Sequence, residues 1–458
     1  MRVAVIGGGA AGMAAASRAK RLLKNAVVTV FEKTEWVSFA LCGIPYYIGC
    51  ITHRLNDLVY YPLEEFIEKR GIDVRVKHEV TDIDVNSKTL TFKTPGGSEE
   101  SYEWDYLVVA PGAKSLAPTI FPEIKELNHV RYIAHLNDAH RIRNEILSLR
   151  ENETINIVGS GYVGLELAHV LRESGYKVRI IEMTQQVLPK SLDPDMAEIV
   201  SSVLKANNVE VILGEKTVGF EEKNSRVKTI TEKGEYDAAY TIVGVGIKPN
   251  TQIAEKIGAK LGETGAIWVD DHMKTSVEDV YAVGDAVETV NLVTGRRGWF
   301  PFAQVANKMG YVAGSNIGGR EAVFPGATGT STLKVFDTTV ARTGLTEDEA
   351  VRLGYNVVTA KLDARTKAHY IPGGKKFTLK VIADADTGRL LGAQGVGPDE
   401  SVFWRINIVA ALLERQGTVW DLFYTDIGYA PVLNPTWDAL VVAARLLMRK
   451  LGEVPRKA

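Results

Sequence analysis

A short apolar strand followed by a glycine-rich turn occurs twice in this chain, with the two turns 152 residues apart. Both turns have the spacing G-x-G-x-x-G, with glycines at Gly7, Gly9 and Gly12 in the first copy and at Gly159, Gly161 and Gly164 in the second. Strand, tight turn and helix in this order open a βαβ unit whose helix N-terminus binds a dinucleotide pyrophosphate. The repeat predicts two Rossmann-like domains. They hold two dinucleotides, the interpretation we favour, or one dinucleotide beside a unit that has lost its ligand.

Each glycine turn is followed by a second strand that ends in a carboxylate, Glu32 in the first copy and Glu182 in the second. These carboxylates lie 20 and 18 residues after the last glycine, a separation at which an acid accepts hydrogen bonds from ribose hydroxyls. Residues 183–186, which follow Glu182, contain no arginine or lysine to bind a ribose 2′-phosphate. The second unit is therefore expected to prefer NADH, with NADPH as the alternative.

The composition excludes several classes of function. The 458 residues include 54 basic and 56 acidic side chains, so the net charge of −2 gives no overall field for binding nucleic acid or an anionic membrane. No apolar run reaches the length of a membrane span; Ala439–Met448 is short and contains Arg445, so we expect an ordinary helix there. The only two cysteines exclude a disulfide scaffold and are typical of a reducing cytoplasm, the expected location.

One of these cysteines, Cys42, stands in the segment Ser38–Gly49, ten residues after Glu32. Gly43 and Pro45 favour a loop that turns into a helix, and a helix N-terminus lowers the pKa of a thiol. The alternative interpretation is a small buried apolar side chain. If residues 43–50 are helical, about 12 Å of axial rise separates Cys42 from Cys50, too far for a disulfide. Cys50 is therefore expected to be structural.

The other strand and helix patterns predict three domains. Residues 72–110 alternate as strands do, and Pro111-Gly112 then turns the chain out of the first domain. Residues 280–286 are predicted to form a strand that ends near Asp285, and residues 301–319 a helix. Beyond residue 330 the patterns predict antiparallel strands at 333–336, 357–360 and 377–382, without a nucleotide motif. The expected domains are residues 1–113 with 246–330, residues 114–245, and residues 331–458.

Together these stretches resemble the flavin-dependent pyridine nucleotide-disulfide oxidoreductases over nearly the whole chain. The resemblance implies a glutathione-reductase-like α/β fold with an FAD-binding domain, an NAD(P)H-binding domain and a C-terminal α+β dimerisation domain. Within the family, the segment Cys42–Tyr46 is similar to the single-cysteine branch, which contains coenzyme A-disulfide reductases, NADH oxidases and NADH peroxidases. Members with two active-site cysteines space them C-x4-C, but residue 47 here is a tyrosine. Peroxidases and water-forming oxidases carry a histidine at the position of Ala10, which speaks against peroxide chemistry.

The resemblance also implies roles for individual residues. For FAD it implies contacts from Gly7, Gly9, Ala10, Ala11, Gly12, Glu32, Lys33, Ser38, Val80, Gly112, Asp285 and Ala303. For the nicotinamide cofactor it implies contacts from Gly159, Gly161, Tyr162, Val163, Gly164, Glu166, Glu182, Gly244 and Gly246. Among these, Tyr162 matches an aromatic residue that covers the flavin when nicotinamide is absent, and Glu166 matches an acid near the nicotinamide. No metal site is expected.

Arg18 and Arg21 lie three residues apart and share one face of the predicted first helix. This face is either a solvated basic surface or, as the resemblance implies, a surface that holds coenzyme A phosphates. The implied substrate residues are Arg18, Arg21, Ser38, Arg70 and Asn307. Ala14 and Leu41 depart from a hydroxyl residue and an asparagine at the matching family positions. Tyr370 and Tyr429 match tyrosines that a partner subunit donates to the active site, so a homodimer is implied.

These observations lead to one main hypothesis and two alternatives. The main hypothesis is an NAD(P)H-dependent reductase of coenzyme A disulfide, acting also on persulfides or polysulfide through Cys42, with Tyr370 or Tyr429 protonating the leaving thiolate. The first alternative is an NADH oxidase in which oxygen reacts at the flavin and Cys42 cycles through sulfenic acid. The second alternative is an electron-transfer reductase for a small redox protein, in which Cys42 has no role.

Overall fold

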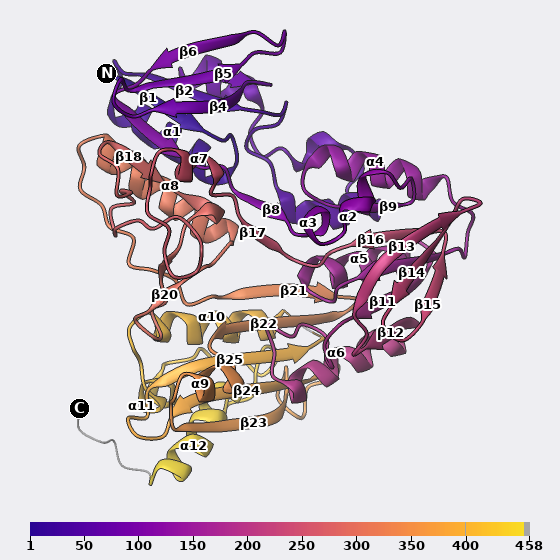
Figure 1. Cartoon of the computed structure of the whole chain (residues 1–458). Coiled ribbons are helices and arrows are strands. Elements are labelled where there is room, and N and C mark those ends of the chain that lie inside the picture. The colour runs from indigo at the N-terminus through magenta and orange to yellow at the C-terminus, as the bar shows by residue number, and fades with distance from the viewer. Residues whose placement is uncertain (399, 453–458) are drawn as a thin grey trace.

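The computed structural model describes residues 1–398 and 400–452. Three five-stranded sheets dominate the described residues, and each sheet is covered by helices (Figure 1). The first two sheets are parallel and the third is antiparallel. This arrangement confirms the α/β fold class and the antiparallel character predicted for the C-terminal part.

The first sheet has the strand order β18-β7-β1-β2-β3. Its strands are β1 (Arg2–Ile6), β2 (Val27–Glu32), β3 (Asp73–Val76), β7 (Tyr106–Val109) and β18 (Val280–Ala282). A small antiparallel sheet stands beside it, formed by β4 (Glu79–Asp84), β5 (Thr89–Lys93) and β6 (Glu99–Glu103). Because β18 pairs with β7, residues on both sides of the second sheet in the sequence build one sheet in space.

The second sheet has the order β12-β11-β10-β16-β9. Its strands are β9 (Val130–Tyr132), β10 (Thr154–Val158), β11 (Lys177–Glu182), β12 (Val209–Leu213) and β16 (Tyr240–Val243). An antiparallel sheet of β13 (Thr217–Lys223), β14 (Arg226–Thr231) and β15 (Glu235–Ala238) accompanies it. The chain enters and leaves this part through β8 (Ala113–Ser115) and β17 (Ile247–Pro249), which pair antiparallel. We therefore propose domain limits at these two strands.

The third sheet has the order β21-β22-β25-β24-β23. Its strands are β21 (Ser331–Val335), β22 (Thr338–Gly344), β23 (Val357–Arg365), β24 (Lys376–Asp384) and β25 (Leu390–Gly397). The helices that accompany it are α9 (Glu347–Arg352), α10 (Ser401–Leu413), α11 (Val419–Tyr424) and α12 (Ala439–Leu451). The helix predicted at Ala439–Met448 is therefore present, as part of α12.

The remaining helices follow or connect the strands of the first two sheets. The longer ones are α1 (Ala10–Leu22), α4 (Leu136–Leu147), α5 (Tyr162–Glu173), α6 (Pro194–Ala206) and α8 (Ala303–Ile317). The shorter ones are η1 (Leu41–Gly43), α2 (Ile44–Ile48), η2 (Leu55–Leu58), η3 (Glu65–Lys69), α3 (Ala117–Ile120), η4 (Pro122–Lys125), α7 (Gln252–Lys256) and η5 (Gly284–Ala286). Two short strands, β19 (Thr289–Val290) and β20 (Arg297–Gly298), pair with each other.

Helices α1 and α8 pack unusually close together because glycines of α8 face α1. A Cβ at Gly310 would lie 2.2 Å from the carbonyl oxygen of Ala11, and one at Gly314 would lie 2.5 Å from that of Ala15. The small residues of α1 accept this approach, and Ala11 and Ala15 are buried. Side chains on the outer faces of both helices are therefore brought next to each other.

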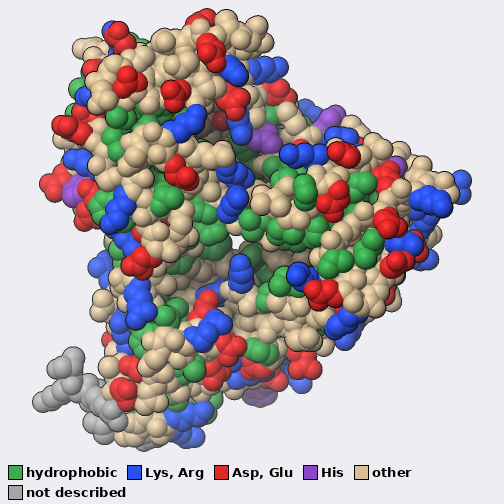
Figure 2. Space-filling model, in the orientation of Figure 1, with side chains coloured by type: hydrophobic (Ala, Val, Ile, Leu, Met, Phe, Trp, Pro, Cys, Tyr) green, Lys and Arg blue, Asp and Glu red, His purple; other side chains and the backbone are tan. Residues whose placement is uncertain are grey.

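The surface agrees with the nearly neutral composition. On the face drawn in Figure 2, basic and acidic side chains are intermixed, and hydrophobic side chains are scattered between them. No helix within residues 1–398 and 400–452 combines the length and the apolar character that crossing a bilayer requires.

Candidate active site

The two glycine turns form open cradles at the N-termini of α1 and α5. Gly9 and Gly161 are the N-cap residues, and a Cβ at either would meet no atom within 4 Å. Neither helix has an acidic residue in its first turn or a side chain that caps its backbone N–H groups. Uncapped N–H groups beside open space suit the pyrophosphate of a dinucleotide, so the residues present fit two such cofactors.

The first glycine of each turn has a different role. Gly7 and Gly159 have φ values of 103° and 101°, which L-residues rarely adopt. A Cβ would lie 2.1 Å from the carbonyl oxygen of Ala110 at Gly7, and 2.4 Å from that of Gly244 at Gly159. The turns can therefore form only with glycine at Gly7 and Gly159, whereas the glycines at Gly9 and Gly161 leave space for a ligand.

The carboxylates predicted to bind ribose are hydrogen-bonded to the backbone of the glycine turns. Glu32 accepts hydrogen bonds from the backbone N–H of Gly8 at 2.8 Å and from the N–H and hydroxyl of Thr34, both at 2.8 Å. Glu182 likewise accepts from the N–H and hydroxyl of Ser160 and of Thr184, at 2.7–3.0 Å. A carboxylate has about four acceptor positions. Glu32 accepts three hydrogen bonds within the protein and so keeps one acceptor position for a ribose hydroxyl. Glu182 accepts four, so a ribose hydroxyl there would replace the hydroxyl of Ser160 or Thr184.

Other residues predicted to contact the cofactors surround the cradles. Ala10 begins α1, and Ala11 is buried below Gly284. Gly112 and Gly246 take left-handed φ values of 69° and 105° where the chain crosses between the sheets. The side chains of Lys33, Val163 and Ala303 are exposed, and Val80 of β4 is half-buried. Their roles toward a cofactor stay predictions.

Cys42 lies in the single turn η1, immediately before α2. The loop ahead of it is fixed because the N–H of Ser38, which has a left-handed φ of 52°, donates to the Gly8 carbonyl at 2.9 Å. Gly43 packs on Leu58, where a Cβ would lie 2.4 Å from a methyl carbon. Cys42 itself is exposed, and it lies four residues after Ser38, whose N–H contacts the first glycine turn.

The expected lowering of the thiol pKa by a helix N-terminus is wrong. Although part of the Cys42 residue is exposed, the protein packed around its thiol raises the thiol pKa by desolvation, and the carboxylates Glu166 and Asp285 raise it further. The helix α2 covers only Ile44–Ile48, too few residues for a strong dipole. Cys42 and Cys50 are both free, which confirms that they do not pair.

Two carboxyl groups near Cys42 titrate close to neutral pH. Burial raises the pKa of Glu166 to about 7, and a hydrogen bond from the Tyr46 hydroxyl at 3.4 Å partly opposes this shift. Burial also raises the pKa of Asp285, in the single turn η5 that follows β18, to about 6. The site therefore contains groups that can hold or release a proton at physiological pH.

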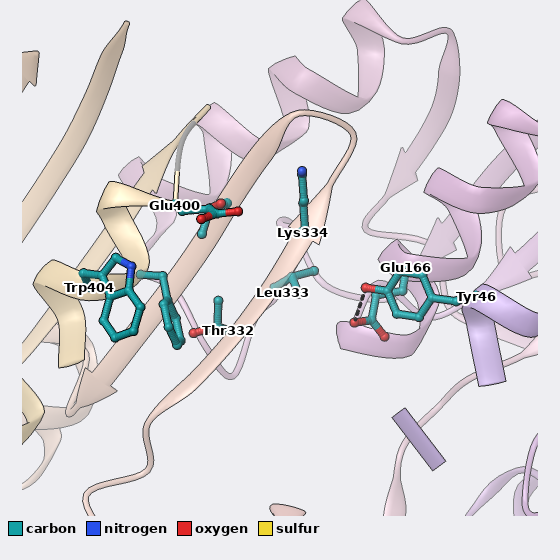
Figure 3. Close-up of a pocket in the computed structure, with 9 residues that line it drawn as sticks. Tyr46, Glu166, Thr332, Leu333, Lys334, Glu400 and Trp404 are labelled. Atoms are coloured by element: carbon teal, nitrogen blue, oxygen red, sulfur yellow. Dashed lines mark hydrogen bonds between the residues drawn. The ribbon is translucent and has the colours of Figure 1, made fainter. Parts of the chain in front are cut away.

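A cavity of about 350 Å³ opens beside Tyr46 and Glu166. Figure 3 shows these two side chains on one side, Trp404 and Glu400 on the other, and β21 passing between them. The lining residues are Tyr46, Glu166, Thr332, Leu333, Lys334, Thr339, Glu400, Phe403 and Trp404. The sequence analysis included Tyr46 only within the similar segment Cys42–Tyr46 and gave it no role of its own. It missed the lining residues of the third sheet and of α10, because no local motif marks them.

A basic and aromatic surface lies on the outer side of α1. The guanidinium of Arg18 lies 4.4 Å from the ring centre of Tyr311 on α8, and its Nε donates to the Ser315 hydroxyl at 2.8 Å. The guanidinium of Arg70 lies 4.4 Å from the ring centre of Tyr61 and donates to the Ser17 hydroxyl at 3.2 Å. Two oriented guanidinium groups and two exposed tyrosine rings are suited to a phosphorylated nucleotide.

The other predicted substrate residues stand at the edge of this surface. Arg21 is exposed at the next turn of α1, and Asn307 is exposed on α8, one turn before Tyr311. The Asn307 amide donates to the Ala303 carbonyl at 3.0 Å. Tyr61 and Tyr311 were not predicted, although the i+4 spacing of Tyr311 from Asn307 places both on one helix face.

Tyr370 and Tyr429, which are far apart in the sequence, meet on the third domain. Their hydroxyls lie 3.2 Å apart, and both side chains are exposed. Among the described residues, the contacts of Tyr370 are to Tyr429 and to the ring of His369, not to Cys42. Within one chain the two tyrosines are therefore brought together, and no contact of either with Cys42 is found among the described residues. Their role toward a partner subunit stays a prediction.

Tyr162 begins α5 and is half-buried between the second unit and the third sheet, where its hydroxyl hydrogen-bonds with the hydroxyl of Ser331. Tyr162 directly follows Gly161 of the second glycine turn. Its predicted role as a cover for the flavin stays a prediction.

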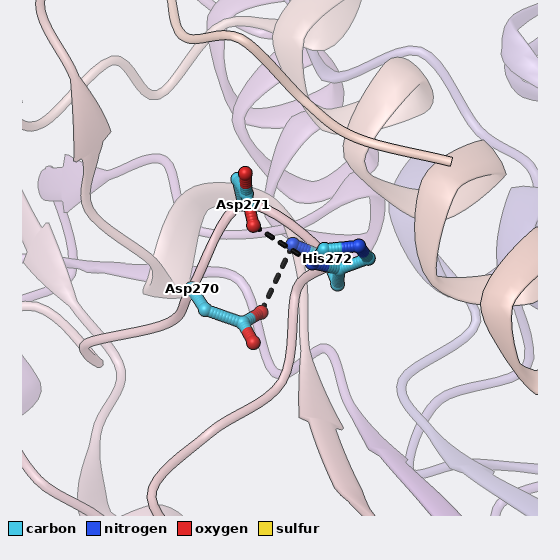
Figure 4. A group of neighbouring side chains, drawn as sticks. All are labelled: Asp270, Asp271 and His272. Atoms are coloured by element: carbon cyan, nitrogen blue, oxygen red, sulfur yellow. Dashed lines mark hydrogen bonds and ion pairs between the residues drawn. The ribbon is translucent and has the colours of Figure 1, made fainter. Parts of the chain in front are cut away.

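Asp270, Asp271 and His272 form a group of possible metal ligands, whose ligand atoms lie within 4.8 Å of one another (Figure 4). Bonds inside the group account for this arrangement. The ring Nδ1 of His272 pairs with Asp271 at 2.7 Å, and Asp270 accepts the backbone N–H groups of His272 and Lys274. The group is a hydrogen-bonded turn, and we assign no ion to it.

Comparison with known proteins identifies related sequences over the full length of the chain. Residues 1–310 match the family model described as pyridine nucleotide-disulphide oxidoreductase, and residues 330–440 match the model for the dimerisation domain of that family. The NAD(P)H sulfur oxidoreductase (CoA-dependent) of Pyrococcus furiosus is 46% identical over 446 residues, which cover 97% of this chain and 99% of the relative.

Two further comparisons are informative. The NADH oxidase of Methanocaldococcus jannaschii is 34% identical over 458 residues, covering 99% of this chain and 100% of the relative. The solved structure of a NAD-dependent persulfide reductase from A. fulgidus is 38% identical, with a TM-score of 0.94, over 99% of this chain and 84% of that chain. Similarity thus extends both to relatives named as sulfur oxidoreductase or persulfide reductase and to one named as NADH oxidase.

Proposed function

The chain belongs to the pyridine nucleotide-disulphide oxidoreductase family, and we propose that it reduces coenzyme A disulfide, and persulfides or polysulfide of coenzyme A, with electrons from NAD(P)H. The observation that supports this proposal best is the exposed Cys42 in a loop that is hydrogen-bonded, through Ser38, to the first glycine turn. The oriented Arg18 and Arg70 on the outer side of α1, which suit a nucleotide substrate, add to it. A cytoplasmic location is part of the proposal.

The two cradles would hold the two cofactors of the family. The first, built from Gly9 and Glu32, would hold FAD, and the second, built from Gly161 and Glu182, would hold NADH or NADPH. When bound, the flavin supplies an electron pair, taken from NAD(P)H, to sulfur. The protein binds and aligns the cofactors through uncapped helix N-termini and braced turns.

Cys42 is proposed as the catalytic nucleophile. Its thiolate attacks one sulfur of the substrate disulfide, so that a Cys42–sulfur bond forms, the substrate S–S bond breaks and one coenzyme A thiolate leaves. That thiolate takes a proton, for which Tyr370 or Tyr429 of a partner subunit is the proposed donor. Two electrons and one proton then cleave the mixed disulfide, which releases the second thiol and restores the Cys42 thiolate.

A homodimer follows from this assignment. The chain matches the dimerisation domain model, and Tyr370 and Tyr429 are exposed and joined to each other on that domain. In the proposed dimer these hydroxyls reach the cysteine of the opposite chain. Neither nucleic acid nor a membrane is proposed as a partner, because the net charge is −2 and charges of both signs are intermixed (Figure 2).

An NADH oxidase activity is the second candidate, since a relative of that name is 34% identical over the full length. Oxygen would then accept electrons at the flavin, and Cys42 would cycle through sulfenic acid. The residue at position 10, an alanine on the first turn of α1, offers no acid or base for peroxide chemistry there.

Exchange of the two cysteines tests the proposal. Cys42→Ser should abolish NAD(P)H-dependent reduction of coenzyme A disulfide while NADH still bleaches the flavin, and Cys50→Ser should keep both activities. Disulfide reduction at the normal rate by Cys42→Ser would refute the proposal. NADH-dependent oxygen consumption that exceeds disulfide reduction in the unmodified enzyme would favour the second candidate.

A further inference from the structure

The helix that follows Cys42 is packed against the second dinucleotide-binding unit. Ile44, Tyr47 and Ile48 of α2 belong to the same buried apolar cluster as residues of α4 and α5. At the end of α2, a Cβ at Gly49 would lie 2.3 Å from the Cβ of Val170. The Ser174 hydroxyl also donates to the Gly49 carbonyl at 3.2 Å. The segment that carries Cys42 is therefore seated on α5.

Tyr46 adds a polar contact to the same face of α5. Glu166, Val170 and Ser174 are spaced four residues apart and so form one stripe along this region. The Tyr46 hydroxyl donates to Oε1 of Glu166 at 3.4 Å, which Figure 3 shows at the edge of the cavity. Tyr46 and Glu166 are both half-buried, so water solvates the charged Glu166 carboxylate poorly. A hydrogen bond from Tyr46 therefore stabilises the charged carboxylate more than it would in water.

We propose that Tyr46 is a positioning residue, which holds the Glu166 carboxylate in its charged form near Cys42 and thereby sets how much of the Cys42 thiol is ionised near neutral pH. Tyr46 acts through Glu166 and is not itself assigned a contact with the substrate. The consequence of this effect for activity rests on the proposed role of Cys42 in catalysis. The effect of Tyr46 on the ionisation of the Cys42 thiol does not depend on that role.

The electrostatic argument has two steps. First, burial raises the pKa of Glu166 to about 7, and the bond from Tyr46 lowers it, so loss of the Tyr46 hydroxyl leaves more Glu166 protonated at neutral pH. Second, after the larger effect of burial, the negative charge of Glu166 raises the pKa of Cys42. Protonation of Glu166 removes this contribution, so the thiolate fraction of Cys42 increases.

Other charged groups around the pair do not replace Glu166. Asp285 also raises the pKa of Cys42, but no hydrogen bond from Tyr46 to Asp285 is found in the described residues. Lys334 of β21 and Glu400 before α10 line the far part of the cavity with opposite charges. After burial and Glu166, the charge of Cys42 also raises the pKa of Tyr46, so a direct effect of the Tyr46 hydroxyl on the thiol must be separated by comparing Tyr46→Phe with and without Glu166→Gln.

Alkylation of Cys42 by iodoacetamide tests the proposal in the FAD-containing enzyme, after reduction by dithiothreitol and removal of the reductant. The rate is followed from pH 5.5 to 9 by mass spectrometry of the peptide that contains Cys42. Tyr46→Phe should accelerate alkylation about threefold near pH 7.5, as half a pKa unit would. At pH 5.5, where Glu166 is protonated in both proteins, the two rates should be equal.

The neighbouring residue provides a matched control. The Tyr47 hydroxyl interacts with Nδ1 of His140 on α4 at 2.9 Å, away from Glu166, so Tyr47→Phe should leave the pH profile unchanged. Glu166→Gln should accelerate alkylation at least as much as Tyr46→Phe, and the double variant should add nothing. An equal effect of both tyrosine variants, or an effect of Tyr46→Phe that persists in Glu166→Gln, would overturn the proposal. Since alkylation requires no turnover, failure of this inference and failure of the proposed activity are separately visible.

Discussion

Replacement of Arg18 by alanine should weaken the binding of coenzyme A disulfide selectively. The Nε of Arg18 donates to Ser315 and its guanidinium lies over the Tyr311 ring, while no hydrogen bond of the two Nη groups is found within residues 1–398 and 400–452. A hydrogen bond to a charged partner contributes about 1.5–3 kcal/mol. Because Arg18 is only half-buried, the lower end of this range applies. The KM for coenzyme A disulfide should therefore rise about tenfold.

The assay compares coenzyme A disulfide with pantethine, a disulfide that lacks the nucleotide phosphates. Arg18→Ala should leave the KM for pantethine and both kcat values unchanged within about twofold, since the reacting sulfurs are the same. Arg21→Ala is the matched control, because no contact orients the exposed Arg21 within the part of the chain that the structure describes, and its effect should stay below about threefold. Higher salt should reduce the difference between Arg18→Ala and the unmodified enzyme. An equal rise of KM for both disulfides would refute the assignment of this surface.

Three other changes test the cradles, the carboxyl group and the tyrosines. A side chain at Gly9 or Gly161 would enter open space, so both variants should fold normally. Gly161→Val should lose NADH binding and keep FAD, whereas Gly9→Val should lose FAD. Absorbance of the flavin and titration with NADH measure these two outcomes. The pKa of Glu166 is raised on folding, so its stabilising contribution is complete below pH 4.5 and is lost as the pH rises through about 7. In urea unfolding, the unmodified protein should therefore gain roughly 2 kcal/mol over Glu166→Gln between pH 8 and pH 5; a constant difference would contradict this. Phenylalanine at both Tyr370 and Tyr429 should lower kcat for disulfide reduction about tenfold or more without changing flavin reduction by NADH.

The elements that depend on local sequence could be predicted. The glycine turns, the acidic strand ends and the apolar strands each follow from residues close together in the chain, and the structure has them where the patterns indicate. The position of β18 beside β7 is different, because the two strands are separated by the whole second sheet in the sequence. Glycine is needed at Gly310 and Gly314 because α8 packs closely on α1, and no local sequence pattern predicts this packing.

The electrostatics of the candidate site could not be predicted from sequence. Tyr46 and Glu166 are 120 residues apart, and Arg18 and Ser315 are 297 residues apart, so their contacts exist only in the folded chain. The pKa of Cys42 was predicted in the wrong direction for the same reason. The local argument considered the helix that follows the cysteine, but burial and the carboxylates of distant segments have the larger effect.

Transfer of electrons through Cys42 to an external sulfur compound is tested most directly by mass spectrometry under non-reducing conditions. The reduced enzyme is treated with one equivalent of coenzyme A disulfide, and then with NADH. The account predicts that one coenzyme A is bound to Cys42 per chain, that one free thiol is released, and that NADH removes the adduct. An adduct on Cys50, or disulfide turnover with Cys42 unmodified throughout, would contradict it.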